Sequence, residues 1–217
     1  MRERLAERLR LYVVTDRGLS RGRSEEEVVR AAVAGGATAI QLRGKDWSGR
    51  DLVAVGRKLR AITREAGVLF FVNDRVDVAL AVEADGAHLG QEDLPLPDAR
   101  RIMGPEPLIG ITVQDEHQAR EAEAGGADYL GTSAVFPTTT KVSDVPPLGL
   151  EVLEAIARAV RIPVVAIGGI GPHNAAEAVR RGAAGVAVVS AVVAAEDVTR
   201  AARELRATVD AALAGRG

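Results

Sequence analysis

The sequence predicts a single α/β domain folded as a closed (β/α)8 barrel (TIM barrel), and three observations predict it. Eight short β-rich runs bounded by turn residues recur at regular spacing along the 217 residues. Segments with helical spacing and helix-capping signals lie between these runs. The runs are almost continuously apolar, as in residues 164–167, which is typical of parallel strands covered on both faces. Eight alternations in about 200 residues favour one closed barrel, and an open doubly wound sheet is the alternative.

The strands are expected, in chain order, at Leu11–Asp16, Ala39–Arg43, Leu69–Asn73, Gly86–Gly90, Leu108–Val113, Tyr129–Phe136, Pro163–Gly168 and Val186–Ser190. Among the helix signals, Ser24 followed by Glu27 is a capping-box pattern. Pro172 suits a first helical turn, and Gly104 and Gly182 follow apparent helix ends. Residues 1–10 alternate charges around two leucines and are expected to form an N-terminal arm or an extra helix of the one domain, 1–217.

Composition excludes several classes of protein. The 28 basic and 30 acidic residues nearly cancel, whereas a nucleic-acid-binding protein usually carries a basic surplus. The absence of cysteine excludes disulfides, thiolate zinc sites and a cysteine nucleophile. No run approaches the roughly 20 apolar residues of a membrane span, and no export signal opens the chain. We therefore expect a cytoplasmic protein whose partners are small molecules, not nucleic acids or membranes, with a homo-oligomer possible.

In a barrel of this kind, chemistry belongs at the carboxyl ends of the strands. The second strand runs into Gln41, Arg43 and Lys45, which alternation places on one face as a wall of donors suited to phosphoryl oxygens. A polar strand end that simply meets water is the alternative. The chain has only three lysines, and two of them, Lys45 and Lys141, fall in loops after strands, which hints at a specific task.

Acidic residues follow the third and fourth strands. Asp74 comes directly after Asn73, and Asp93 follows the fourth strand. Neighbouring strands lie about 4.8 Å apart, so both carboxylates can reach one ion. Two carboxylates without a histidine pair or a cysteine suit Mg²⁺, which binds one or two protein carboxylates together with substrate phosphate. The alternative is that each aspartate caps the helix that follows it.

The loops after strands six to eight suit a phosphate group. The sixth strand leads into Thr138, Thr139, Thr140 and Lys141, in a long loop that is able to close over a substrate. The seventh strand ends in a glycine-rich turn around Gly169, and the eighth ends near Ser190. Glycines let backbone N–H groups approach an anion, and loops seven and eight are the recurrent phosphate site of this fold. A plain threonine-rich surface loop is the alternative.

The remaining polar and aromatic residues carry less information about function. His88 is expected to be a packed, hydrogen-bonded histidine, and Trp47 is expected to pack at the rim of the barrel. Asp128 precedes the sixth strand and is interpreted as structural. The site after strands two to four holds more positive charge than a monophosphate needs, so we interpret it as the site of a diphosphate donor. The glycine-rich site after strands seven and eight is then the site of a phosphorylated acceptor. A leaving diphosphate needs stabilisation of its developing charge more than it needs a general base.

These residues resemble the thiamine phosphate synthase family over essentially the whole chain. The matching blocks are Gln41 to Lys45, Asn73 to Asp77, Gly86 to Asp93, Gly131 to Lys141, Ala166 to Ile170 and Val189-Ser190. The resemblance implies a Mg²⁺-dependent transferase that joins hydroxymethylpyrimidine diphosphate to hydroxyethylthiazole phosphate, carboxylated or not, with release of thiamine monophosphate and diphosphate. It also implies a dissociative mechanism, in which diphosphate leaves before the thiazole nitrogen attacks.

The resemblance also implies roles for individual residues. Those implied to bind the pyrimidine diphosphate are Gln41, Leu42, Arg43, Gly44, Lys45, Asn73, Thr112 and Lys141, of which Arg43, Lys45, Thr112 and Lys141 are the catalytic set. Those implied to bind the thiazole phosphate are Thr138, Thr139, Thr140, Gly169, Val189 and Ser190. Asp74 and Asp93 are implied to hold one Mg²⁺ ion together with the diphosphate.

Three positions depart from the family pattern. Gly44 stands where many members carry an acidic residue, Thr112 replaces a serine, and Gln114 replaces a common histidine. The nearest alternative function is that of a thiazole tautomerase or regulatory relative on the same barrel. A sugar-phosphate isomerase barrel and a non-enzymatic phosphate sensor are further alternatives.

Overall fold

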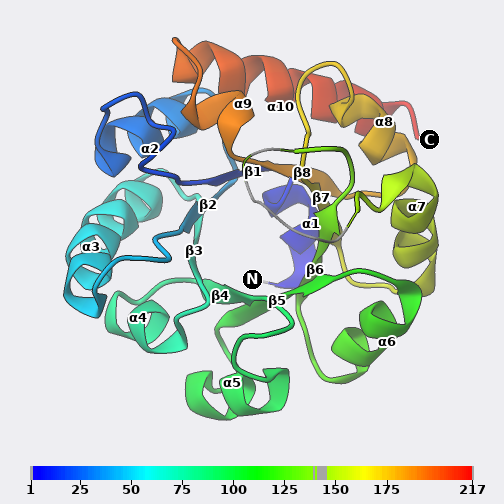
Figure 1. The fold of residues 1–217 in the computed structure, drawn as a ribbon, viewed down its shortest axis with the longest axis horizontal. Helices are drawn as coiled ribbons and strands as arrows, with labels where there is room; N and C mark the ends of the chain where they lie inside the picture. The colour runs from blue at the N-terminus through cyan, green and yellow to red at the C-terminus, as the bar shows by residue number, and fades with distance from the viewer. Residues whose placement is uncertain (1, 139, 141–145, 217) are drawn as a thin grey trace.

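The computed structural model describes residues 2–138, 140 and 146–216, and its strands form a closed parallel barrel (Figure 1). Strand order follows chain order, and β1 pairs with β8 to close the ring. The strands are β1 (Leu11–Val14), β2 (Ala39–Leu42), β3 (Leu69–Asn73), β4 (Gly86–Leu89), β5 (Leu108–Val113), β6 (Tyr129–Ala134), β7 (Val164–Ile167) and β8 (Gly185–Val188). The predicted (β/α)8 fold is confirmed.

Helices surround the barrel, and α10 completes the ring by packing against both α2 and α8 (Figure 1). The helical elements are η1 (Arg2–Arg4), α1 (Leu5–Arg8), α2 (Glu25–Ala34), α3 (Gly49–Glu65), α4 (Val76–Ala81), α5 (Leu96–Met103), α6 (Glu116–Ala124), α7 (Gly149–Ala159), α8 (Ala175–Arg180), α9 (Ser190–Val193) and α10 (Val198–Ala214). Each of the eight strands is thus followed by at least one helix, which carries the chain back to the start of the next strand or, after β8, to the C-terminus.

The strands lie where they were predicted, but six of the eight end one or two residues earlier than expected, and only β3 and β5 match at both ends. Ser24 and Glu27 form the expected capping box at the start of α2, and Gly104 caps α5. Pro172 was expected inside a first helical turn, but α8 begins only after Asn174. Ser190 was expected to end a strand, whereas it opens the short helix α9. The residues after the last paired position belong to the loops at the carboxyl end of the barrel, and the sequence pattern does not mark where pairing stops.

The barrel interior is filled by aromatic rings and closed at one end by α1. Leu5 and Leu9, from and just after α1, are buried in the same cluster as Tyr12, Phe71 and Tyr129. Residues expected to form an arm or an extra helix therefore pack against the amino ends of the strands, and Figure 1 shows α1 within the outline of the barrel. An apolar plug at that end leaves the opposite, carboxyl end for a polar site.

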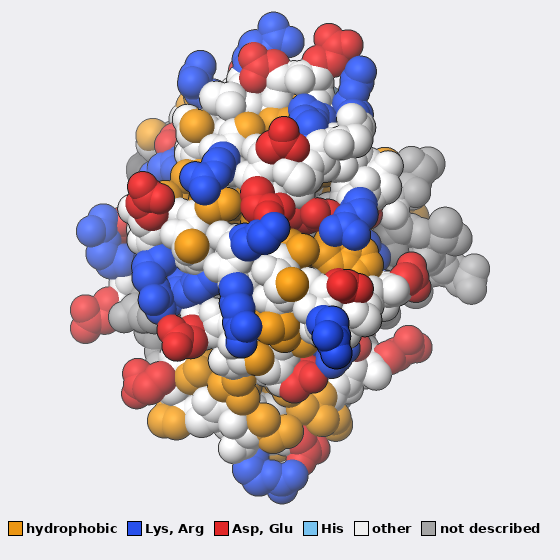
Figure 2. All heavy atoms as spheres, turned by 90° about the vertical axis from the view of Figure 1, so that its left-hand side faces the viewer, with side chains coloured by type: hydrophobic (Ala, Val, Ile, Leu, Met, Phe, Trp, Pro, Cys, Tyr) orange, Lys and Arg blue, Asp and Glu red, His pale blue; other side chains and the backbone are white. Residues whose placement is uncertain are grey.

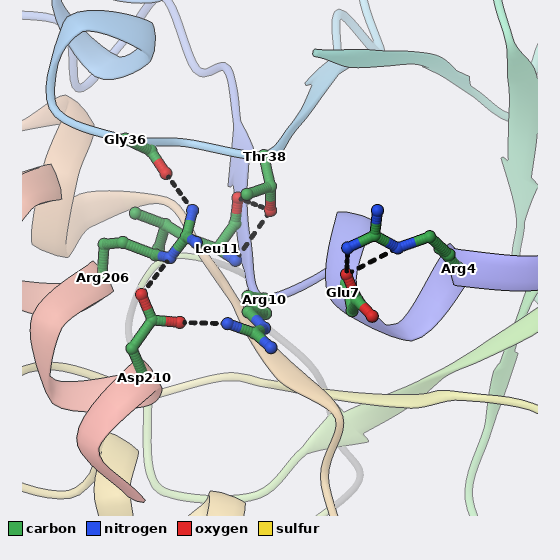
Figure 3. A network of polar contacts seen from close by, with 8 residues as sticks. All are labelled: Arg4, Glu7, Arg10, Leu11, Gly36, Thr38, Arg206 and Asp210. Carbon is green, nitrogen blue, oxygen red and sulfur yellow. Dashed lines mark hydrogen bonds and ion pairs between the residues drawn. The ribbon is translucent and has the colours of Figure 1, made fainter. Parts of the chain in front are cut away.

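Polar contacts tie the amino end of the barrel together around α10 (Figure 3). Asp210 accepts hydrogen bonds from Arg10 (2.9 Å) and from Nε of Arg206 (2.7 Å). Arg206 also donates to the carbonyl oxygen of Gly36 at 3.0 Å, just before β2. The C-terminal helix is thereby fixed to the segments that enter β1 and β2.

The outer surface over α2, α3 and α4 mixes basic, acidic and apolar side chains, as Figure 2 shows. The described helices include none that is both long and apolar enough to traverse a lipid bilayer.

Candidate functional site

A cavity of about 740 Å³ opens at the carboxyl ends of the strands. Its walls come from residues of all eight strands and from the segments that follow β2, β6, β7 and β8, including the turn after β7 and the start of α9. The sequence-predicted residues that line it are Gln41, Arg43, Asn73, Thr112, Thr138, Thr140, Gly169, Val189 and Ser190. Residues spread over 150 positions of sequence from Gln41 to Ser190 are therefore brought to one site by the closure of the barrel.

A chain of hydrogen bonds crosses the floor of this cavity. Gln41 donates from Nε2 to the Tyr12 hydroxyl (2.8 Å), which lies 3.0 Å from the Tyr129 hydroxyl. The Tyr129 hydroxyl lies 3.0 Å from Nδ1 of His88, and Nε2 of His88 lies 2.9 Å from Oγ1 of Thr112. Burial raises the pKa of both tyrosines, so they stay neutral.

One order of donors gives every hydroxyl hydrogen in this chain a partner. With Gln41 donating to Tyr12, Tyr12 can donate to Tyr129 and Tyr129 to Nδ1 of His88. In the matching tautomer, Nε2 of His88 carries the hydrogen and donates it to Thr112. In this order Thr112, which lines the cavity, keeps its own hydroxyl hydrogen for a ligand.

The predicted cationic wall after β2 is only partly assembled. The Arg43 side chain lines the cavity and lies 3.4 Å from Oδ2 of Asp16, whereas Lys45 is exposed at the rim. Since β2 ends at Leu42, strand alternation does not extend to Lys45. The Leu42 side chain is fully buried in the core between barrel and helices, so any contact it makes with a ligand comes from its backbone.

Asp74 and Asp93 meet at the mouth of the barrel, as the order of β3 and β4 requires. Burial, a hydrogen bond with Asp93 and the charge of Asp93 raise the pKa of Asp74 from its ordinary 3.8 to about 6, and the charges of Lys45 and Arg43 oppose this rise. Asp93 also accepts the backbone N–H of Gly90 at 2.7 Å. Asp74 has a φ of 61°, a left-handed conformation that costs energy in most residues other than glycine, asparagine and aspartate.

This pair fits a hard divalent cation. Asp93 raises the pKa of Asp74, a pair of facing carboxylates gains from a cation placed between them, and Mg²⁺ prefers oxygen ligands of this kind. Among the described residues there is no group of three or more histidine, aspartate and glutamate side chains able to hold a metal. An ion at this pair would take its remaining ligands from other oxygens, such as those of water or a substrate.

The opposite side of the cavity is built from backbone and hydroxyl groups. Gly168 and Gly169 have φ values of 89° and 63°, and a Cβ on Gly169 would lie 2.4 Å from the carbonyl oxygen of Pro137. Buried Asn174 holds this turn, since it donates to the carbonyl of Gly169 (2.9 Å) and accepts the N–H of Gly171 (2.9 Å). The hydroxyls of Thr140 and Ser190 lie 3.4 Å apart across the gap.

Several predictions fall elsewhere or were not made. Thr139 and Lys141 lie outside the described residues, as do the other residues of 141–145 in the loop expected to close. His88 is packed and hydrogen-bonded as expected, and Asp128 is structural as expected. The sequence interpretation missed Tyr12 and Tyr129, whose only signal is a hydroxyl within an otherwise apolar strand, and Asn174, which directly precedes α8.

Comparisons with known proteins agree with this geometry. The family model described as thiamine monophosphate synthase matches residues 11–192. The chain is 55% identical over 199 residues to a thiamine-phosphate synthase of Moorella thermoacetica, covering 92% of this chain and 95% of the relative. It is 56% identical over 200 residues to the enzyme of the same name from Chloroflexus aurantiacus, covering 92% of each. A solved thiamine phosphate pyrophosphorylase from Pyrococcus furiosus superposes with a TM-score of 0.88 at 51% identity, covering 96% of this chain and 99% of that one.

Proposed function

The chain belongs to the thiamine monophosphate synthase family, and from this we propose how its cavity joins a pyrimidine diphosphate to a thiazole phosphate. It is a transferase, which forms a C–N bond and releases diphosphate. The observation that carries the assignment of residues is that two unlike anion sites lie at the carboxyl end of the barrel. Arg43 lines the cavity and is close to Lys45, Asp74 and Asp93, whereas a glycine turn with hydroxyls lines the cavity after β6 to β8.

The diphosphate substrate is assigned to the side with Arg43, Lys45 and the two aspartates. A guanidinium binds phosphoryl oxygens in a bidentate manner, and an ammonium acts as a point charge. Asp74 and Asp93 would hold Mg²⁺, which would neutralise charge on the diphosphate when bound. Asn73, the Gly44 and Leu42 backbone, and Lys141 from the loop after β6 complete the residues assigned to this substrate.

The thiazole phosphate is assigned to the opposite side. Left-handed Gly169, fixed by Asn174, leaves its backbone accessible to an anion, and Ser190, Thr138 and Thr140 supply hydroxyl donors. Val189 lines the same wall of the cavity. Thr139 is assigned to this substrate because it lies between Thr138 and Thr140 in the sequence. A site of neutral donors suits a monoester, whereas the charged side suits the greater charge of a diphosphate.

The reaction needs no general base in this arrangement. The bond between the pyrimidine methylene carbon and the diphosphate oxygen breaks, and its electron pair leaves with the diphosphate. The thiazole nitrogen then forms the C–N bond with its own lone pair, so no proton moves. Arg43, Lys45, Lys141 and the Thr112 hydroxyl hydrogen stabilise charge that develops on the leaving oxygen. Gln41, held by Tyr12, presents its remaining amide oxygen to the pyrimidine.

Incubation with both substrates and Mg²⁺, followed by mass detection of thiamine monophosphate and measurement of diphosphate, tests this function. We expect one product and one diphosphate per pyrimidine consumed, and nothing when either substrate is omitted. Isomerisation of the thiazole alone indicates the tautomerase alternative, conversion of a sugar phosphate indicates an isomerase, and binding without turnover indicates a sensor. Each of these outcomes contradicts the proposal. The cytoplasmic location and the possibility of a homo-oligomer stay predictions.

A further inference from the structure

Two loops at the rim of the barrel contact each other through a single tryptophan. Trp47 lies in the loop between β2 and α3, and its ring centroid is 3.7 Å from the guanidinium carbon of Arg17, which follows β1. Arg17 is in turn held by Glu25, which accepts hydrogen bonds from Nε (3.0 Å) and Nη2 (3.1 Å). Glu25 is buried, so the guanidinium has a fixed anchor at the start of α2. Trp47 is therefore held against a cation whose own position is set by a bidentate ion pair.

The same ring covers the backbone of Gly44. A Cβ added to Gly44 would lie 2.6 Å from Cδ2 and 2.7 Å from Cγ of Trp47, distances that require the ring to move. The φ of Gly44 is outside the left-handed region, so a side chain is excluded here by lack of space and not by backbone conformation. The N–H of Trp47 also donates to the carbonyl of Gly44 at 3.3 Å, which closes the turn beneath the ring.

Gly44 stands between the two cations of the diphosphate side. Arg43 precedes it and is held by the loop after β1, since its N–H donates to Oγ1 of Thr15 (3.1 Å) and its guanidinium lies 3.4 Å from Asp16. Lys45 follows it and is exposed, yet it is near enough to lower the proton affinity of Asp74. Within the part of the chain that the structure describes, no ion pair fixes the Lys45 side chain, so its direction depends on the backbone of the turn.

We propose that Trp47 is a positioning residue for the diphosphate substrate, acting through Gly44 on Arg43 and Lys45. The ring, held by Arg17, fixes the turn so that both cations face the carboxylate pair of Asp74 and Asp93. Glycine at position 44 leaves the space that the ring occupies. The departure from the family pattern at this position thus has a steric reason. The inference rests on the proposed function, because it requires diphosphate to bind beside Arg43.

A cycle of three variants tests the contact. Gly44→Ala and Trp47→Ala should each raise KM for the pyrimidine diphosphate about tenfold, within the ~10²-fold that a 1 Å misplacement can cost. The double variant should be no worse than Trp47→Ala alone, because the ring atoms that Cβ would meet are gone. Trp47→Phe keeps an aromatic face for Arg17 and should stay within about threefold of the wild type. KM for the thiazole phosphate should change little in all of them.

Binding of inorganic diphosphate with Mg²⁺, measured by calorimetry, gives a second readout without turnover. We expect the two single variants to bind it more weakly by the same factor as their change in KM. Arg64→Ala is the matched control, since among the described residues its guanidinium pairs only with the exposed Glu83 carboxylate, and Arg64 does not line the cavity. It should leave KM and diphosphate affinity at wild-type values.

The outcomes separate the two proposals. A wild-type protein that gives no thiamine monophosphate contradicts the proposed function, whatever the variants do. Wild-type turnover with an unchanged Gly44→Ala variant overturns the positioning role. The positioning role is also overturned if Gly44→Ala raises KM by the same factor with and without Trp47. It is overturned as well if KM rises equally for both substrates. Melting temperatures of all variants distinguish loss of fold from loss of position.

Discussion

Aspartates lie at both ends of this barrel, but their surroundings are opposite. At the amino end, Asp85 accepts hydrogen bonds from two nitrogens of Arg60 (2.9 and 3.2 Å) and from the N–H of Phe70 (2.8 Å). Asp128 repeats this arrangement two strands later with Arg100 (2.7 Å) and the N–H of Ile109 (2.8 Å). At the carboxyl end, Asp74 faces another carboxylate, and its pKa is raised.

The difference shows where the fold is stabilised and where it is left destabilised. At the amino end each carboxylate has a cation and a backbone donor, so its charge is compensated within the chain. At the carboxyl end two carboxylates are brought together and the nearby cations compensate them only in part. A barrel that is well matched at one end can tolerate a mismatched pair at the other, and that pair is available for a ligand.

The largest effect is expected from removing a compensated aspartate. Asp128→Ala leaves the charge of the partly buried Arg100 guanidinium with backbone carbonyl partners but no carboxylate, and it leaves the Ile109 N–H without its acceptor. The free energy of unfolding should therefore fall by about 3–5 kcal/mol. Urea denaturation measures this, and the kinetic constants of the folded fraction should not change. If the variant does not fold, Asp128→Asn, which keeps an acceptor for Ile109, should still lose stability.

The matched control for this variant is Asp98→Ala. Asp98 pairs with Arg101 on the surface of α5, and both side chains are exposed. Surface pairs of this kind contribute about 0–1 kcal/mol, so its unfolding free energy should stay near the wild-type value. Equal losses in Asp98→Ala and Asp128→Ala would contradict the distinction between the two ends of the barrel.

The opposite pattern is expected at the carboxyl end. Asp93→Asn keeps an acceptor for the Gly90 N–H and removes one charge of the pair, so stability should be unchanged or higher. Turnover should fall about 10²-fold or more, as loss of electrostatic stabilisation at a leaving group can cause. Steady-state kinetics and urea denaturation on the same sample measure both effects. Loss of stability together with full activity would contradict the comparison, because it would show that Asp93 stabilises the fold and is not needed for the reaction.

The sequence predicted the strands and the pairing of distant residues well, because both follow from simple geometry. Parallel strands in chain order bring every post-strand loop to one end, so Asp74 and Asp93 had to become neighbours once the barrel closed. The capping box at Ser24 was also predictable, because it is a purely local contact. Features that depend on strand order or on local capping contacts can therefore be predicted from the sequence.

Contacts across the barrel interior could not be predicted in the same way. Tyr12 and Tyr129 meet because a Cβ on Gly110 would lie 2.1 Å from the Tyr129 ring, so the glycine makes room for the tyrosine. This fit depends on the register between β5 and β6, and the contact between the two tyrosines joins the non-adjacent strands β1 and β6; no single-strand pattern encodes either. For Lys45, strand alternation was extended beyond Leu42, where β2 ends, so alternation could not predict the direction of its side chain.

The smallest expected effect is the pH dependence of the free energy of unfolding that arises from the carboxylate pair of Asp74 and Asp93. Folding raises the pKa of Asp74 from 3.8 to about 6, so the folded state binds this proton more tightly than the unfolded state does. The resulting destabilisation is absent below about pH 4, grows as pH rises to about 6 and is constant above it. Asp74→Asn removes this destabilisation, and asparagine is tolerated at the left-handed φ of this position. At pH 8 without divalent cations the variant should therefore be more stable than the wild type by about 1 kcal/mol, a value reduced for the solvent screening of a half-exposed group. Urea denaturation of both proteins from pH 4 to 8 measures the difference, which cancels the other titrating groups. A difference that shrinks as pH rises through this window would show that the two carboxylates do not oppose each other.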